Sequence, residues 1–134
     1  MKELTNDELI EKAGSVINTK MIGEFKVANV GAALVTDKGN VYLGVSIDVG
    51  SGVGFCAEHS AIAAMVTAGE YKMAKIVAVW KDEKGVYVVS PCGRCREFIR
   101  QIDKSNIGTE VILSKDKSVK LSELLPYSDS FEKV

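Results

Sequence analysis

The chain has 134 residues, of which 46% are apolar and 26% charged, and its formal net charge is −1. This length fits one domain, residues 1–134, around one hydrophobic core, and the absence of a Lys/Arg stripe argues against nucleic acid as a partner. No apolar run approaches the roughly 20 residues that span a bilayer and the N-terminus is too acidic for a signal peptide, so we expect a cytoplasmic protein with no membrane partner.

Helices and strands are predicted to alternate along the chain. A first helix begins at Asn6 or Asp7, either of which can cap apolar residues that recur at helical spacing. The predicted strands are 27–35, 41–47, 75–80, 86–89 and 109–113, and further helices are predicted at 56–68, 93–102 and 121–125. Several strands are apolar on both faces, which indicates a sheet covered by helices on both sides. The predicted fold is a three-layer α/β/α sandwich with a mixed five-stranded sheet.

All three cysteines lie in two short segments, Cys-Ala-Glu-His at 56–59 and Ser-Pro-Cys-Gly-Arg-Cys at 90–95. Each segment leads into the first turn of a predicted helix, where backbone N–H groups and the helix dipole favour thiolate and lower the cysteine pKa. Three thiolates can hold one Zn²⁺ and leave a fourth position open to water, which is typical of catalytic zinc sites. Glu58 is close enough to a ligand to reach that water without binding the metal.

Other interpretations of these cysteines remain open at this point. A structural zinc site needs a fourth ligand, but the chain has no fourth cysteine and its only histidine, His59, lies beside Cys56. A thioredoxin-like motif would stand after the first βα unit rather than late in the chain and behind a proline. An odd number of cysteines argues against a disulfide framework. Inert buried cysteines and a non-catalytic zinc module are the alternatives that remain.

The pair of motifs resembles the cytidine deaminase superfamily, in its compact nucleoside-type branch: C-A-E at 56–58 and P-C-x-x-C at 91–95. V-G-A-A-L at 30–34 and L-L-P at 124–126 extend the resemblance over nearly the whole chain, and P-C-G-R-C-R at 91–96 is similar to blasticidin-S deaminases. The resemblance implies a cytidine deaminase-like fold and one Zn²⁺ per chain, with Cys56, Cys92 and Cys95 as ligands. It also implies hydrolytic deamination of a free cytosine nucleoside or, as the alternative, of a blasticidin-S-like aminopyrimidine antibiotic.

Carried over residue by residue, the resemblance implies roles around the metal. Glu58 is expected to act as base and then acid, moving protons from water to the ring and to the departing ammonia. The carbonyl of Ser90 and the N–H of Ala57 are expected to orient the exocyclic amine and the developing charge. At the position of His59, typical members carry an arginine that hydrogen-bonds a ligand thiolate. We expect Arg94 to replace that arginine here.

The resemblance also implies how the substrate is held and how the chain assembles. Ser46 and Asp48 match an asparagine and a glutamate that bind the ribose hydroxyls in typical members, and Ala28 matches an aromatic residue that packs on the pyrimidine. These three shorter side chains predict weakened recognition of cytidine. The compact members imply a homotetramer, and Tyr127 and Phe131 are candidates to reach a neighbouring active site.

Overall fold

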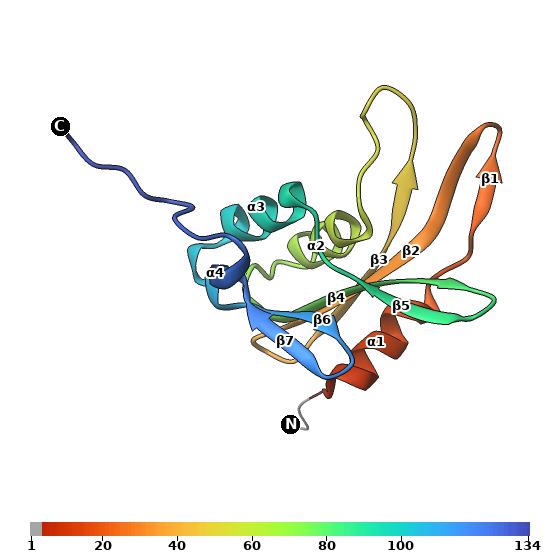
Figure 1. Ribbon diagram of the computed structural model, residues 1–134, viewed down its shortest axis with the longest axis horizontal. Coiled ribbons are helices and arrows are strands. Elements are labelled where there is room, and N and C mark those ends of the chain that lie inside the picture. Colours follow the sequence, from red (N-terminus) through yellow and green to blue (C-terminus); the bar gives the residue numbers. More distant parts are fainter. Residues whose placement is uncertain (1–3) are drawn as a thin grey trace.

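The computed structural model describes residues 4–134 and consists of a twisted sheet with helices on both faces (Figure 1). The strands are β1 (Lys20–Ile22), β2 (Phe25–Thr36), β3 (Val41–Asp48), β4 (Met73–Asp82), β5 (Gly85–Val89), β6 (Glu110–Ser114) and β7 (Lys117–Lys120). The helices are α1 (Asn6–Ser15), α2 (Ala57–Thr67), α3 (Gly93–Ile102) and α4 (Leu121–Leu124), with a 3₁₀ turn, η1, at Lys104–Gly108. Among these helices, none is long and apolar enough to cross a membrane.

The sheet is mixed, as predicted. Its hydrogen-bonded order is β1-β2-β4-β6-β7, with β3 also paired to β2 and β5 also paired to β4. The β4–β6 pair is parallel and the other described pairs are antiparallel. All five predicted strands are present. Two short strands, β1 and β7, were not predicted, because three exposed residues and four mostly polar residues carry no apolar alternation.

The predicted three layers are confirmed by the two faces of the sheet. One face packs on α1, with a core of Leu9, Ala13, Ala33, Val35, Val77, Val79 and Ile112. The other face packs on α2, α3 and α4, with a core that includes Ala32, Leu34, Ile62, Met65, Ile76, Ala78, Ile99, Val111 and Leu121. Alternating residues of β2 and β4 therefore serve opposite cores, which is why these central strands are apolar throughout.

Two details at the helix ends differ from the prediction. The N-cap of α1 is Thr5, whose hydroxyl accepts the N–H of Glu8, rather than Asn6 or Asp7. The second helix, predicted over 56–68, ends one residue earlier, at Thr67, and Ala68 is its exposed C-cap. Neither change moves the motif segments, since both lie away from the first turns of α2 and α3.

Close packing of α2 on β3 fixes where the first cysteine lies. A Cβ atom on Gly44 would collide with the backbone nitrogen of Ala61, so only glycine lets the helix approach the strand this closely. The chain entering α2 is also held by two hydrogen bonds of 3.0 Å between Ile47 and Phe55, one in each direction. Cys56, the residue after Phe55, is therefore held next to the end of β3.

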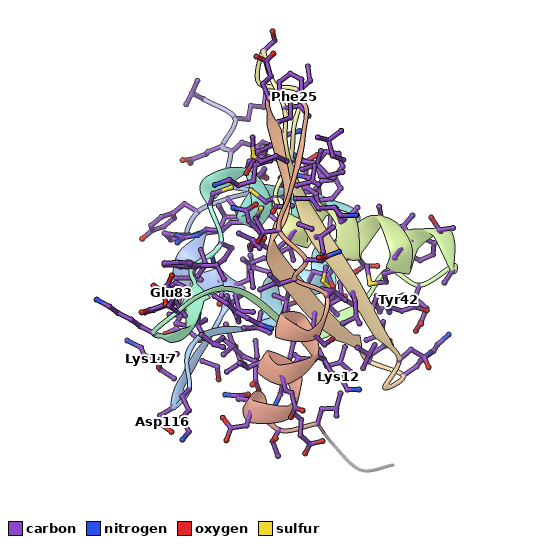
Figure 2. All side chains as sticks on the ribbon, turned by 90° about the vertical axis from the view of Figure 1, so that its right-hand side faces the viewer. Lys12, Phe25, Tyr42, Glu83, Asp116 and Lys117 are labelled. Atoms are coloured by element: carbon purple, nitrogen blue, oxygen red, sulfur yellow. The ribbon has the colours of Figure 1, made fainter. Side chains whose placement is uncertain are left out.

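One end of the molecule projects beyond the helices. The β1–β2 hairpin and the loop between β3 and α2 extend away from the body of the sheet (Figure 1). Figure 2 shows Phe25 at this end and Lys12, on α1, toward the opposite one. Exposed apolar side chains gather here, namely Met21, Ile22, Phe25 and Val53.

A buried carboxylate ties the β2–β3 turn to the end of α2. Glu70 accepts hydrogen bonds from the Tyr42 hydroxyl at 2.6 Å and from the Asn40 amide at 2.9 Å. The Tyr42 bond is the main cause that lowers the pKa of Glu70, and the same bond raises the pKa of Tyr42. A carboxylate whose pKa is lowered in the folded state adds stability above its unfolded pKa and loses it as the pH falls.

We therefore expect Glu70→Gln to lower the melting temperature by a few degrees at pH 7. The difference from the wild type should shrink as the pH falls below the ordinary glutamate value of 4.5. Thermal unfolding followed by circular dichroism between pH 7 and pH 3 measures both. A difference that stays constant over this range would show that the charge of Glu70 contributes nothing.

Candidate functional site

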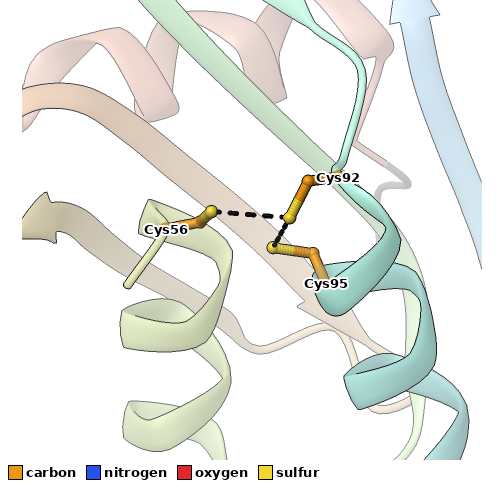
Figure 3. Close-up of side chains that lie close together, drawn as sticks. All are labelled: Cys56, Cys92 and Cys95. Carbon is orange, nitrogen blue, oxygen red and sulfur yellow. Dashed lines mark hydrogen bonds between the residues drawn. The ribbon is translucent and has the colours of Figure 1, made fainter. Parts of the chain in front are cut away.

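The three thiols predicted as metal ligands meet at the N-termini of two helices. Cys56 is the N-cap of α2 and Cys92 the N-cap of α3, while Cys95 lies in the first turn of α3. The sulfur of Cys92 is 3.7 Å from that of Cys56 and 3.5 Å from that of Cys95 (Figure 3). All three sulfur atoms lie within 4.8 Å of one another and no disulfide joins them.

This geometry fits one zinc ion. Thiolates bound tetrahedrally at about 2.3 Å from zinc lie about 3.8 Å apart, close to the two measured separations. Sulfur donors suit zinc and not magnesium or calcium, which prefer oxygen. Among residues 4–134 these three cysteines are the only cluster of this kind, so the protein offers three ligands and a fourth position remains for water.

The pKa values of the thiols only partly follow the expectation from the helix N-termini. Burial raises the pKa of Cys92, but hydrogen bonds from the N–H of Cys95, the thiols of Cys95 and Cys56 and the N–H of Arg94 together outweigh it, so the net pKa is lowered. Burial raises the pKa of Cys56 and, more strongly, that of Cys95, where the Glu58 carboxylate adds to the effect. The prediction of lowered pKa values is therefore right for one cysteine and wrong for two. Metal binding must displace protons from the two thiols whose pKa burial raises, Cys56 and Cys95.

Glu58 lies in the first turn of α2, and its side chain is almost fully buried. Only 5% of the residue is exposed, and burial raises the pKa of its carboxyl group. It borders a small void lined also by Ala78, Val89 and Pro91. Glu58 lies two residues after Cys56, the N-cap of α2, and its negative charge raises the pKa of both Cys56 and Cys95.

The contact to a ligand thiol comes from His59 rather than from Arg94. His59 Nδ1 lies 3.5 Å from the sulfur of Cys95. The imidazole ring is stacked on Phe98, with ring centroids 4.3 Å apart and planes 5° from parallel. Arg94 instead donates from Nη1 to the carbonyl oxygen of Gly54 at 3.3 Å. No hydrogen bond among the described residues joins Arg94 to a thiol, because its side chain leaves α3 toward the loop before α2, and its expected role beside the metal stays a prediction.

We expect His59→Ala to weaken zinc binding by about 10- to 100-fold, the usual cost of losing a hydrogen bond that orients a metal ligand. His59→Asn, which can still donate to Cys95, should recover part of this loss. Competition for zinc with a chelating dye measures the affinities. Arg94→Ala is the matched control, and a larger loss there than in His59→Ala would restore the original assignment.

The two residues predicted to orient the exocyclic amine lie beside the cluster. Ala57 is fully buried as the first residue of α2, where the initial N–H groups of a helix have no partner within it. Ser90 precedes Pro91 at the end of β5, and its hydroxyl accepts a hydrogen bond from Arg96 at 3.1 Å. Arg96 also donates to the carbonyl of Pro91 at 2.8 Å, which holds the segment that leads to Cys92.

The predicted ribose-binding pair does not present two free side chains. Ser46 is 4% exposed, and its hydroxyl accepts the N–H of Val30 and donates to Asn29 Oδ1. Asp48 is exposed at the end of β3. Ala28 has a φ of 59°, in the left-handed region, and lies in an irregular part of β2. The involvement of Asn29 was not predicted, because only the irregularity brings it to Ser46.

Comparisons with known proteins agree with this arrangement. Residues 5–110 match the family described as the cytidine and deoxycytidylate deaminase zinc-binding region. The chain is 41% identical over 98 residues to blasticidin-S deaminase from Bacillus cereus, with 69% of each chain covered. It is 31% identical over 99 residues to a cytidine deaminase from Mycobacterium tuberculosis, covering 72% of this chain and 69% of that one. The crystal structure of cytidine deaminase from Burkholderia pseudomallei superposes with a TM-score of 0.73 at 29% identity, over 96% of this chain and all of that one.

Proposed function

Because this chain belongs to the family of cytidine and deoxycytidylate deaminases, we propose that it converts the 4-amino group of a free cytosine nucleoside to a keto group with release of ammonia. It is a zinc-dependent hydrolase of C–N bonds with one zinc per chain. The observation that carries the proposal is the juxtaposition of three thiols with one buried carboxylate, that of Glu58. A structural zinc site has no use for a carboxylate beside its ligands.

In this reaction the C4–N4 bond breaks and a C4–O bond forms. Bound zinc supplies a Lewis acid that lowers the pKa of water. Cys56, Cys92 and Cys95 hold the metal, and His59 orients Cys95 through its Nδ1. Glu58 accepts a first proton from the attacking water and delivers it to ring N3, then accepts the remaining proton of the new hydroxyl at C4 and delivers it to the departing amine. Its burial excludes bulk water, which would otherwise compete for these protons.

Atoms of the backbone complete the amine site in this proposal. The carbonyl of Ser90, in the segment before α3, accepts from the exocyclic amine, and the N–H of Ala57, at the start of α2, faces the developing charge. The Arg96 bonds to Ser90 and Pro91 keep that segment in place. Arg94 holds the Gly54 carbonyl and so fixes the loop that leads to Cys56.

A second candidate substrate is an aminopyrimidine antibiotic of the blasticidin-S type. Two observations favour it: the 41% identity to the blasticidin-S deaminase of Bacillus cereus, and the short residues Ala28, Ser46 and Asp48. Small side chains leave room for a sugar that is bulkier than ribose. The same zinc and Glu58 machinery serves both substrates, since the reacting ring is the same.

A panel of substrates tests the proposal. Zinc-loaded protein is incubated with cytidine, deoxycytidine, cytosine and blasticidin S, and ammonia is measured at the end point. Release from cytidine or deoxycytidine supports the nucleoside deaminase. Release from blasticidin S alone assigns the second candidate, and no release from any of the four contradicts both.

We further propose a cytoplasmic homotetramer that acts in pyrimidine salvage, with residues 1–134 as one deaminase domain. Tyr127 and Phe131 support the assembly, because they are 88% and 94% exposed on a tail that extends away from the body (Figure 1). Three free cysteines are typical of a reducing compartment. Sedimentation equilibrium tests the assembly, and a fully active monomer would contradict it.

A further inference from the structure

An irregularity in β2 changes which way its side chains point. In the pairing of β2 with β3, Val27 is opposite Ile47 and Gly31 is opposite Val45. Three residues of β2, from 28 to 30, therefore face the single residue Ser46. Ala28 makes this possible by adopting a φ of 59°, which is costly for a residue other than glycine. Bulges of this kind often redirect a side chain next to a functional site.

The irregularity directs Asn29 to the face of the sheet that carries α2. Simple alternation would place Asn29 with Gly31, whose Cα faces α1 at Ala13. The observed hydrogen bond instead joins Asn29 Oδ1 to the hydroxyl of Ser46 at 2.8 Å. Gly44 packs directly on α2, and Ser46, two residues later in the same strand, therefore points to the same face of the sheet. Because Asn29 is hydrogen-bonded to Ser46, its side chain lies on this face as well.

This part of the α2 face adjoins the thiol cluster. The residue after Ser46 is Ile47, which pairs with Phe55, the residue before Cys56. The residue before Ser46 is Val45, whose carbonyl accepts the hydroxyl of Ser60 at 2.7 Å. Ser60 lies two residues after Glu58 on α2, so Asn29 and Ser46 line the flank of the first turn that carries the catalytic carboxylate.

The hydrogen bonds at Ser46 determine which end of the Asn29 amide is available. The Ser46 hydroxyl accepts the N–H of Val30 at 3.1 Å and gives its only proton to Asn29 Oδ1. The carbonyl end of the amide is therefore engaged, and Nδ2, with its two donors, is directed away from Ser46. Within residues 4–134 the hydrogen bonds give Nδ2 no partner, and the side chain is only half-buried.

We propose that Asn29 is a positioning residue for the substrate, donating from Nδ2 to a hydroxyl of the nucleoside sugar. The inference rests on the proposed function. The C4 end of the ring must lie at Glu58 and the thiols, so the sugar, attached at N1 on the far side of the ring, extends toward the flank of the cleft. Asn29 thus replaces the direct sugar contact expected of Ser46, which acts as its anchor.

The test compares Asn29→Ala with the wild type on cytidine and on two analogues, 2′,3′-dideoxycytidine and 5′-deoxycytidine. On cytidine we expect KM to rise about tenfold with kcat nearly unchanged, since the contact is the same in the ground state and the transition state. The loss should disappear on the one analogue that lacks the contacted hydroxyl. Asn29→Asp can keep the Ser46 bond and accept from a hydroxyl, so it should recover part of the affinity.

Zinc content and melting temperature, measured on every variant, separate this effect from damage to the fold. Asn40→Ala, at the opposite end of the β2–β3 pair, is the matched control and should leave KM unchanged. If Asn29→Ala does not fold, Ser46→Ala supplies the same comparison, because it removes the anchor. Equal losses on all three substrates would overturn the inference. A wild type that is inactive on all three would overturn the proposed function and the inference with it.

Discussion

Replacement of Glu58 by glutamine should reduce kcat by about 10²- to 10⁴-fold, the contribution of a well-placed general acid–base group. Glutamine has nearly the same shape but cannot accept the proton of water or deliver one to ring N3. The buried position of Glu58 means that bulk solvent cannot take over this role. The measurement is the rate of conversion of cytidine, followed by the change in absorbance of the ring.

Two controls make the result specific to the carboxylate. Zinc content should remain at one per chain in Glu58→Gln, because the ligands are the three cysteines. Glu97→Gln removes a half-buried carboxylate of α3 that pairs with Arg100, and it should keep normal activity. A Glu58→Gln enzyme with near wild-type kcat would reduce Glu58 to a structural residue.

The second large effect is expected from Cys92→Ala, which should lose most of the bound zinc and all measurable activity. Two remaining thiolates cannot complete a stable zinc site, and Cys92 lies between the other two sulfur atoms. Metal analysis by mass spectrometry after dialysis against a chelator gives the zinc content. Circular dichroism of the same sample should show retained secondary structure, since Cys92 is exposed and belongs to neither hydrophobic core.

A triple variant tests whether the three cysteines are the zinc ligands. Simultaneous replacement of Cys56, Cys92 and Cys95 by alanine removes every cysteine of the chain. Tight retention of zinc by this variant would mean that other groups bind the metal, and the assignment of the site would be wrong.

The fold was predictable to the extent that packing leaves a periodic pattern in the sequence. The central strands serve two cores and are therefore apolar throughout, and α3 begins and ends at its predicted residues, Gly93 and Ile102. The edge strands β1 and β7 were not predicted, because such short strands at the edge of a sheet bury no alternating apolar side chains. The cap at Thr5 was missed because threonine, asparagine and aspartate are adjacent there and all can serve.

In the site, the ligand thiols were predictable because their spacing is local, but the surrounding contacts were not. Whether Arg94 or His59 approaches a thiol depends on the direction in which each side chain leaves its helix and on the stacking of His59 against Phe98. Asn29 reaches Ser46 only through a left-handed residue at Ala28, for which an alanine gives no signal in the sequence.

Removal and restoration of zinc tests most directly whether the protein is a zinc-dependent deaminase. The protein is stripped with a chelator under reducing conditions, and ammonia release from cytidine is measured before stripping, after stripping and after addition of one equivalent of zinc. The account predicts activity in the first sample, none in the second, and recovery in the third to nearly the initial rate. Deamination that persists in the protein shown to be free of metal would contradict it.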